Sequence, residues 1–349
     1  MAGDFRFVDL FSGIGGMRLG LEAVGGRCVY SVELDQFARK TYAANFGQAP
    51  EGRDIRDVES LPEHEVLAAG FPCQPFSLAG ISKKRSLGRH DGFLDQAQGT
   101  LFFEVLRLAS AARPRVVLLE NVKHLLRHDR GRTYEVIKGS LEELGYNVSE
   151  TIIDARSWVP QHRERIFIVG LRRDYYGASR FIFPGVPRRS TTLSSILEAS
   201  VEPKYRLTRH LWRYLREYAE RHRARGNGFG FGLVGPQDVA RTLSARYHKD
   251  GSEILIRGGH GRTPRRLTPR ECSRLMGFPK GFRIVVSDTQ AYRQFGNAVV
   301  PDAVSHVAHA LVVQAELHRV TEQLALVICE RAEQLRRPTP AADLLLPID

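Results

Sequence analysis

Short apolar runs alternate with amphipathic stretches along the chain as far as residue 171. The apolar runs cover residues 5–11, 27–34, 65–71, 115–122 and 165–171. The stretches between them have helical periodicity and cover residues 17–25, 35–47, 101–112 and 133–145. Strands that alternate with helices are typical of βα units, so the pattern predicts an α/β fold with a mainly parallel sheet. Sites on such sheets lie at the C-terminal ends of the strands.

The pattern changes after residue 185. The following hundred residues are rich in Arg, Gly and His, and no regular element is predicted for 226–235. We interpret this part as a second, smaller domain with many loops. Strand and helix patterns return near 289–301, and a long helix is predicted for 302–335 before a Pro-broken tail. The predicted division of the chain is therefore 1–185, 186–285, 286–335 and a tail at 336–349.

The formal net charge of the chain is +12 and its pI is about 9.8. Such a balance favours a polyanionic partner, because Lys and Arg displace counterions from phosphates. A basic surface that only keeps the protein in solution is the alternative.

The four cysteines, Cys28, Cys73, Cys272 and Cys329, lie far apart and form no CxxC pair. A zinc or redox motif is therefore not expected, and we predict no metal. The chain has no predicted signal peptide, and no apolar run of 18 residues that would span a membrane. We expect a protein of the reducing cytoplasm.

A glycine turn follows the first apolar run, in FVDLFSGIGG, with Gly13, Gly15 and Gly16. Glycine lets the backbone approach a ligand, so a strand, a glycine turn and a helix can hold a nucleotide-type cofactor. The next run ends at Glu33, where a carboxylate could accept both ribose hydroxyls. Asp54 follows at the end of a predicted short third strand. A plain βα turn and a helix-capping Asp54 are the alternatives.

Cys73 stands in GFPCQPFS, between Pro72 and Pro75 and directly after an apolar run. Prolines fix φ, so the thiol is expected to be held rigidly at a strand end, which suits nucleophilic attack. A buried structural cysteine is the alternative.

Three charged residues fall at the ends of later apolar runs. Glu120, in VVLLENV, could act as an acid or hydrogen-bond donor, or could be a capping or salt-bridged residue. Arg163 and Arg165 are two apart on an extended segment, so their side chains are expected on one side. They could meet a carbonyl, a phosphate or the Glu, or form a solvated basic edge.

Nine strings, in order, resemble the motifs of the bacterial cytosine-5 DNA methyltransferase family over about residues 5–315. They are DLFSGIGG, VELD, GFPCQPFS, GTLFFEVLR, ENV, QHRERIFIVG, RTLSARY, RRLTPRECSRLMGFP and YRQFGNAVVP. The resemblance implies a Rossmann-like, S-adenosylmethionine-dependent methyltransferase domain with a smaller target-recognition domain inserted before the C-terminal helices. It implies that Cys73 is the nucleophile, that Glu120 is its acid partner, and that Arg163 and Arg165 support them.

The same resemblance implies the ligand contacts. Phe11 would stack on the adenine of S-adenosylmethionine, Glu33 would bind the ribose, Asp54 the adenine amino group, and Asn297 would complete the site. The other residues expected at the cofactor are Gly13, Ile14, Gly16, Leu34, Ile55, Pro72 and Leu101. The residues expected at DNA are Ser77, Lys83, Lys84, Arg85, Thr242, Ser244, Arg246 and Lys249.

Within 186–285 the strings resemble Dcm-type enzymes, which methylate the inner cytosine of CCWGG. The chain lacks the long N-terminal extension of that type, is shorter between residues 262 and 265, and has Ala79 where some relatives have serine. The target is thus expected to be CCWGG or a related CC-containing site such as RCCGG, methylated after the cytosine is flipped out of duplex DNA.

Several readings remain beside this one. An RNA cytosine methyltransferase on the same scaffold and a catalytically inactive DNA-binding regulator are the alternatives. An amino-methyltransferase is disfavoured, because the chain has no [DNS]PP[YFW] tetrapeptide. We expect a bacterial, nucleoid-associated monomer, and the sequence leaves open whether it works beside a cognate restriction endonuclease.

Overall fold

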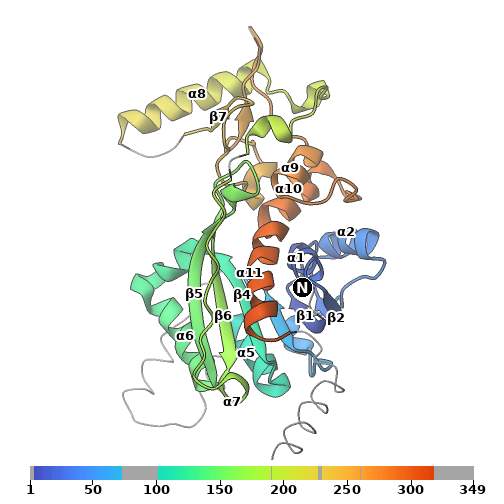
Figure 1. Cartoon of the computed structure of the whole chain (residues 1–349). Helices are drawn as coiled ribbons and strands as arrows, with labels where there is room; N and C mark the ends of the chain where they lie inside the picture. The colour runs from blue at the N-terminus through green and yellow to red at the C-terminus, as the bar shows by residue number, and fades with distance from the viewer. Residues whose placement is uncertain (1–3, 73–100, 190, 227–229, 260, 318–349) are drawn as a thin grey trace, which may run out of the picture.

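The computed structural model describes residues 4–72, 101–189, 191–226, 230–259 and 261–317. Its centre is a six-stranded sheet in the order β2-β1-β3-β4-β6-β5 (Figure 1). Strands β2, β1, β3 and β4 run parallel, and β6 runs antiparallel to both of its neighbours, β4 and β5. Their bounds are Phe5–Leu10 (β1), Gly26–Val32 (β2), Val66–Ala69 (β3), Val116–Val122 (β4), Tyr146–Asp154 (β5) and Glu164–Arg172 (β6).

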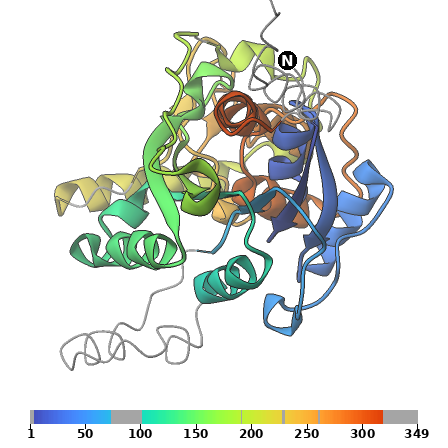
Figure 2. The ribbon, with the colours of Figure 1, turned by 60° about the horizontal axis from the view of Figure 1, so that its bottom comes forward.

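Helices cover both faces of this sheet. Alternate side chains of β1 point to opposite faces, so Phe7 enters one apolar cluster and Val8 the other. The first cluster lies under α1 (Gly16–Glu22) and α11 (Pro301–Gln314), and the second lies under α5 (Leu101–Ala112) and α6 (Arg132–Glu143). Figure 2 shows the two helix layers on opposite sides of the sheet. This confirms the predicted α/β fold.

The elements between residues 186 and 285 lie above the sheet in Figure 1. They are helix α8 (Arg209–Ala224), the short strands β7 (Leu233–Val234) and β8 (Leu255–Ile256), and helix α9 (Pro269–Leu275). Helix α10 (Asp288–Asn297) leads back towards the sheet and into α11. The other α-helices in the described part of the chain are α2 (Gln36–Phe46) and α7 (Arg173–Tyr176). The domain boundaries stay a prediction.

Two predicted elements are wrong. The long helix expected for 302–335 ends at Gln314, because Glu316 takes a left-handed φ of 47° and the Leu317 N–H bonds to the Val312 carbonyl at 3.2 Å. This arrangement closes a helix, as in a Schellman motif. No strand ends at Asp54 either. The preceding backbone makes a single β-bridge, between Val32 and Glu51.

Strand β5 is absent from the predicted runs. Its nine residues alternate between buried and more exposed positions at the sheet edge, so they show no continuous apolar run. Among the described residues, every helix is too short or too polar to cross a membrane.

Candidate active site

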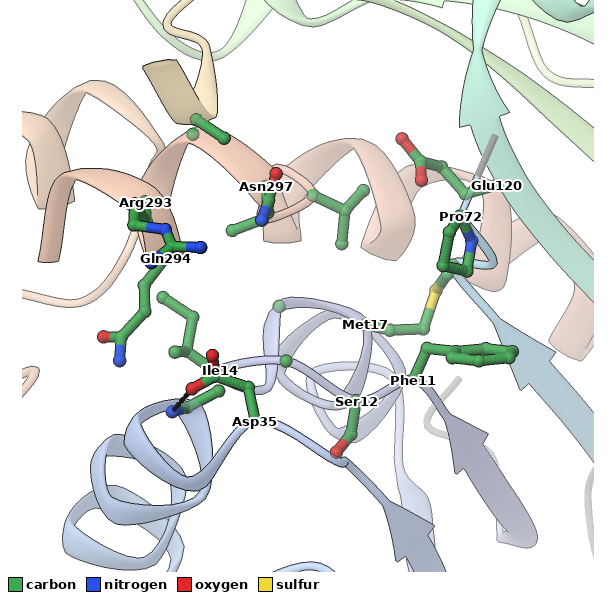
Figure 3. Close-up of a pocket in the computed structure, with 18 of the residues that line it drawn as sticks. Phe11, Ser12, Ile14, Met17, Asp35, Pro72, Glu120, Arg293, Gln294 and Asn297 are labelled. Carbon is green, nitrogen blue, oxygen red and sulfur yellow. Dashed lines mark hydrogen bonds between the residues drawn. The ribbon is translucent and has the colours of Figure 1, made fainter. Parts of the chain in front are cut away.

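A cavity of about 660 Å³ lies beyond the C-terminal ends of the parallel strands. Its walls come from three parts of the chain (Figure 3). The strand ends supply residues from Asp9 to Met17, Glu33, Gly70–Pro72 and Glu120–Val122. The upper region supplies residues 242–245, and α10 with the turn after it supplies residues 290–299. Strand ends of a parallel sheet are where the sequence predicts the site.

The glycine turn forms one wall. Gly13 and Gly15 have φ angles of 55° and 88°, which favour glycine. A Cβ on Gly16 would lie 2.6 Å from the Val299 carbonyl oxygen, so this glycine lets α1 meet the segment before α11. The turn therefore needs glycine both for its backbone shape and for its packing.

Glu33 holds that turn from the end of β2. Its carboxylate accepts the Gly13 N–H and the Asp35 N–H, each at 2.8 Å. Burial raises its pKa, and these backbone hydrogen bonds oppose the shift. Each carboxylate oxygen can accept a further hydrogen bond, so the group can bind ligand hydroxyls while it holds the turn.

Phe11 begins the turn with a left-handed φ of 58°, which is rare for a residue with a large side chain. Its ring lies in the cavity near Pro72 and Met17 (Figure 3). Backbone strain of this kind is common at ligand sites. The strained backbone thus presents a flat apolar surface to a ligand.

Of the residues predicted at the cofactor, the structure brings seven to the cavity, namely Phe11, Gly13, Ile14, Gly16, Glu33, Pro72 and Asn297. It places Leu34, Asp54, Ile55 and Leu101 outside the described lining. Asp54 caps the 3-10 helix Ile55–Asp57 and pairs with Arg56 at 2.7 Å, which lowers its pKa. The cofactor roles of these four residues stay predictions.

Glu120 and Arg165 form an ion pair in the opposite wall. The Arg165 Nε lies 3.1 Å from the Glu120 Oε1, and the side chains are 15% and 12% exposed. Burial raises the pKa of Glu120, against the effect of the arginine, and burial also lowers the pKa of Arg165. A carboxyl group with a raised pKa is suited to holding or giving a proton.

The segment that leads to Cys73 runs beside this pair. The Glu120 Oε2 lies 3.6 Å from where a Cβ on Gly70 would be, and the Asn121 amide donates to the Phe71 carbonyl at 2.9 Å. Pro72 and Glu120 are neighbours in Figure 3. Cys73 itself lies outside the described residues, as do Ser77, Lys83, Lys84 and Arg85.

Arg163 does not line the cavity, although Arg165 does. Its guanidinium is buried behind the wall and donates to the carbonyls of Leu243 (2.8 Å), Gly296 (3.0 Å) and Ala298 (2.6 Å). Burial lowers its pKa to about 9. The side chain thus ties the residue before β6 to two cavity segments that are remote in the sequence. Its predicted role in catalysis is untested.

We expect Arg163→Met to lower the free energy of unfolding by about 3 kcal/mol, because three carbonyls, two of them in buried hydrogen bonds, lose a charged donor. Urea denaturation measures this change. Arg27→Met, at an exposed position of β2, is the control and should shift stability by under about 0.5 kcal/mol. Equal shifts in both variants would contradict the assignment of Arg163 as a buried tie.

The residues predicted to contact DNA in the upper region divide into two pairs. Thr242 and Ser244 line the cavity, and their hydroxyls already bond to the His162 carbonyl and to Glu253. Arg246 and Lys249 are exposed and have no ion pair among the described residues. The second pair is therefore the one available to a phosphate.

Several lining residues are absent from the predicted set. Asp9 is 1% exposed, and neither carboxylate oxygen has a hydrogen-bond partner in the described part of the chain. Burial raises its pKa to about 8. The sequence does contain a signal for this residue, because Asp9 is an acid inside the apolar run FVDLF. Gln290, Arg293 and Gln294, from α10, are also absent from the predicted set, although the string YRQFGNAVVP covers Arg293 and Gln294.

Comparisons with known proteins agree with this geometry. Residues 5–313 match the family of C-5 cytosine-specific DNA methylases. The chain is 48% identical to a DNA-cytosine methyltransferase of Escherichia coli K12 over 88% of this chain and 77% of that protein. It is 44% identical to the type II methyltransferase M.DsaV of Dactylococcopsis salina over 95% of this chain and 93% of that protein.

Solved structures share the fold. The Dnmt2 methyltransferase of Schizosaccharomyces pombe superposes with a TM-score of 0.68 at 19% identity, covering 89% of this chain and 99% of that one. The Entamoeba histolytica methyltransferase EhMeth gives 0.67 at 18% identity over 89% and 99% of the two chains. These likenesses confirm the predicted fold of S-adenosylmethionine-dependent methyltransferases. With the sequence match over residues 5–313, they lead to one assignment: the chain belongs to the C-5 cytosine-specific DNA methylase family and is a DNA cytosine-5 methyltransferase.

Proposed function

We propose that the protein transfers a methyl group from S-adenosylmethionine to carbon 5 of a cytosine in a short duplex sequence, through a covalent adduct on Cys73. The observation that carries the proposal is the buried Glu120–Arg165 pair beside Gly70–Pro72 and across the cavity from the glycine turn. An acid–base pair beside the segment that leads to Cys73, in a cavity with a cofactor cradle, suits this reaction better than simple binding.

The residues of the cavity fit the cofactor. Glu33 can bind ribose hydroxyls, and the Phe11 ring offers an apolar face. S-adenosylmethionine bound in this cavity would supply an electrophilic methyl group. Asn297 and the glycine turn would orient that group towards the Glu120 wall.

Cys73 and Glu120 would activate the base together. The Cys73 thiolate would bond to carbon 6 of the cytosine while the Glu120 carboxyl gives a hydrogen bond or its proton to ring nitrogen 3. Carbon 5 would then carry the electron pair that takes the methyl group, with S-adenosylhomocysteine as the leaving group. Loss of the carbon-5 proton to a base, with water as the proposed acceptor, breaks the sulfur–carbon bond and frees Cys73. Arg165 would keep Glu120 in place and meet the base carbonyl.

A cytosine in a duplex must leave the stack before carbon 6 can be attacked, which costs roughly a few kcal/mol. Phosphate contacts would offset this cost. Arg246 and Lys249 are exposed next to the cavity segment 242–245, and we propose that they contact DNA there. The loop that carries Lys83, Lys84 and Arg85 would add charge, and it lies outside the described residues.

We propose CCWGG, or a related CC-containing site such as RCCGG, as the target. The support is the similarity of the 186–285 strings to Dcm-type enzymes. Labelled methyl donor with duplex DNA, followed by bisulfite mapping, tests both activity and target. Methylation of one short motif is expected. Label that enters RNA alone would favour the RNA methyltransferase alternative. Several relatives are named type II methyltransferases, so we also propose a cognate restriction endonuclease.

We expect Glu33→Ala to weaken cofactor binding by about 1–3 kcal/mol, because charged hydrogen bonds to the ligand and to the Gly13 turn are lost. Calorimetric titration with S-adenosylmethionine measures this. Glu51→Ala is the control, since Glu51 is exposed and lies outside the described cavity lining. An unchanged affinity in Glu33→Ala would remove Glu33 from the cofactor site.

A further inference from the structure

Helix α8 stands out from the upper region in Figure 1 and packs along one narrow face. Of its 16 residues only Leu215 and Ala219 are buried. Leu215 joins a small apolar cluster with Leu207 and Leu255. Most of the helix surface is therefore exposed and unused by the fold.

That exposed surface is strongly basic. Residues 209–225 contain six arginines and two glutamates, so they carry four of the twelve net positive charges of the chain. Four of these arginines fall in one stripe along the helix, because each residue turns by about 100°; they are Arg209, Arg213, Arg216 and Arg223, and Glu220 lies in the same stripe between the last two. Among the described residues, only Arg213 reaches a carboxylate, that of Glu217 at 4.0 Å.

The basic last turn of α8, with Arg221, His222 and Arg223, complements the helix dipole, but the first turn does not. Arg209 and His210 occupy the first turn, where no acidic residue is present. Positive charge at a helix N-terminus is unfavourable, because it opposes the macrodipole. A polyanion bound along the helix would account for Arg209, whereas local stability does not.

The place of α8 also favours a polyanion. Figures 1 and 2 both show it on the side of the molecule that holds α6 and the 3-10 helices Lys123–Leu126 and His128–Gly131. These 3-10 helices directly follow β4, whose Glu120 lines the cavity. Arg127 and Arg130 are exposed there without an ion pair among the described residues. The arginines of α8 and those of the 3-10 helices are therefore exposed on the same side of the molecule.

We propose that α8 is an arm that binds the phosphate backbone of duplex DNA outside the base pairs that the active site recognises. The arginine stripe is about 21 Å long, which corresponds to about six phosphates of one strand. Guanidinium groups suit such a contact, because they bind phosphate oxygens in pairs. The proposal rests on the proposed function, since it needs a duplex seated with one cytosine in the cavity.

The test replaces Arg209 and Arg223, which bracket the helix and have no described contacts that the fold uses. Fluorescence anisotropy of Arg209→Gln/Arg223→Gln is measured with duplexes of about 10 to 30 base pairs, one to three helical turns, centred on the sequence that bisulfite mapping identifies. The control is Arg27→Gln/Lys40→Gln, which removes two exposed charges from β2 and α2. Thermal melting checks that each variant is folded.

On the long duplex, we expect the slope of log affinity against log salt to become shallower by about two, one unit for each lost phosphate contact. Between 50 and 200 mM salt this corresponds to about a tenfold smaller loss of affinity. The shortest duplex and the control variant should keep the wild-type slope.

Two results would overturn the arm. An unchanged slope on the long duplex would show that α8 does not bind DNA phosphates, and its charge would then favour another partner, such as an acidic protein. Equal changes on short and long duplexes would place α8 at the recognised base pairs. Wild-type methylation is followed in parallel, so that its absence shows the proposed function to be wrong, whereas normal methylation with an unchanged slope shows only the arm to be wrong.

Discussion

Replacing Cys73 with serine is expected to abolish methyl transfer, by about 10⁴-fold or more, while DNA binding survives. A free thiol, with a pKa of about 8.5, is a few per cent ionised at neutral pH, and the thiolate is a strong nucleophile. A serine hydroxyl stays protonated there and attacks carbon 6 poorly. Single-turnover transfer of labelled methyl groups measures the rate, and anisotropy with the same duplex measures binding.

Cys28→Ser is the matched control. Burial raises the pKa of Cys28 to about 12, and Cys272 is fully buried with its pKa also raised, so neither supplies a thiolate at neutral pH. The Cys28 variant should therefore keep its transfer rate. If Cys73→Ser kept its turnover, the covalent adduct on Cys73 would be wrong, although the protein would still be a DNA methyltransferase.

Glu120→Gln is expected to lower the rate of transfer by about 10²–10³-fold, because an amide can hydrogen-bond to ring nitrogen 3 but cannot give it a proton. Gln also leaves Arg165 buried without its carboxylate partner. Pre-steady-state transfer rates separate this loss from binding. Glu164→Gln, on the same strand as Arg165 and more exposed, is the control.

The pH dependence gives a second reading of Glu120. Burial raises its pKa, so the carboxyl stays protonated to a higher pH than an exposed glutamate does. If the protonated form acts, the wild-type rate falls as pH rises through that raised pKa, and Glu120→Gln loses this limb. An identical alkaline limb in both proteins would assign it to another group.

Local patterns predict the parts of this fold that depend on local chemistry. The apolar runs correspond to β1, β2, β3, β4 and β6, and the structure adds a hydrogen bond between Glu33 and the glycine turn that the pattern did not predict. Strand β5 was not predicted, because an edge strand buries only alternate residues and so has no continuous apolar run. The helix predicted to 335 failed at Glu316, since a left-handed residue without glycine has no clear sequence signal.

The contacts that the sequence could not predict are the long-range ones. The side chains of Arg163 and Arg165 were expected on one side of their segment. Arg165 lines the cavity, whereas Arg163 is buried behind it. The difference depends on where the carbonyls of Leu243, Gly296 and Ala298 arrive, which no local pattern contains. The position of Asp9 in the cavity wall likewise depends on how α1 and α11 pack.

The Arg163 tie has a consequence for how such enzymes diversify. Its three acceptors are main-chain carbonyls, which every residue possesses, so the joint does not depend on the chemistry of the side chains that supply them. Gly296 alone is constrained, since a Cβ there would lie 2.3 Å from the backbone of Ser244. The region around Leu243, which we propose reads the target, can therefore exchange its side chains during evolution or be grafted between relatives. One arginine and one glycine would keep it attached to the sheet domain.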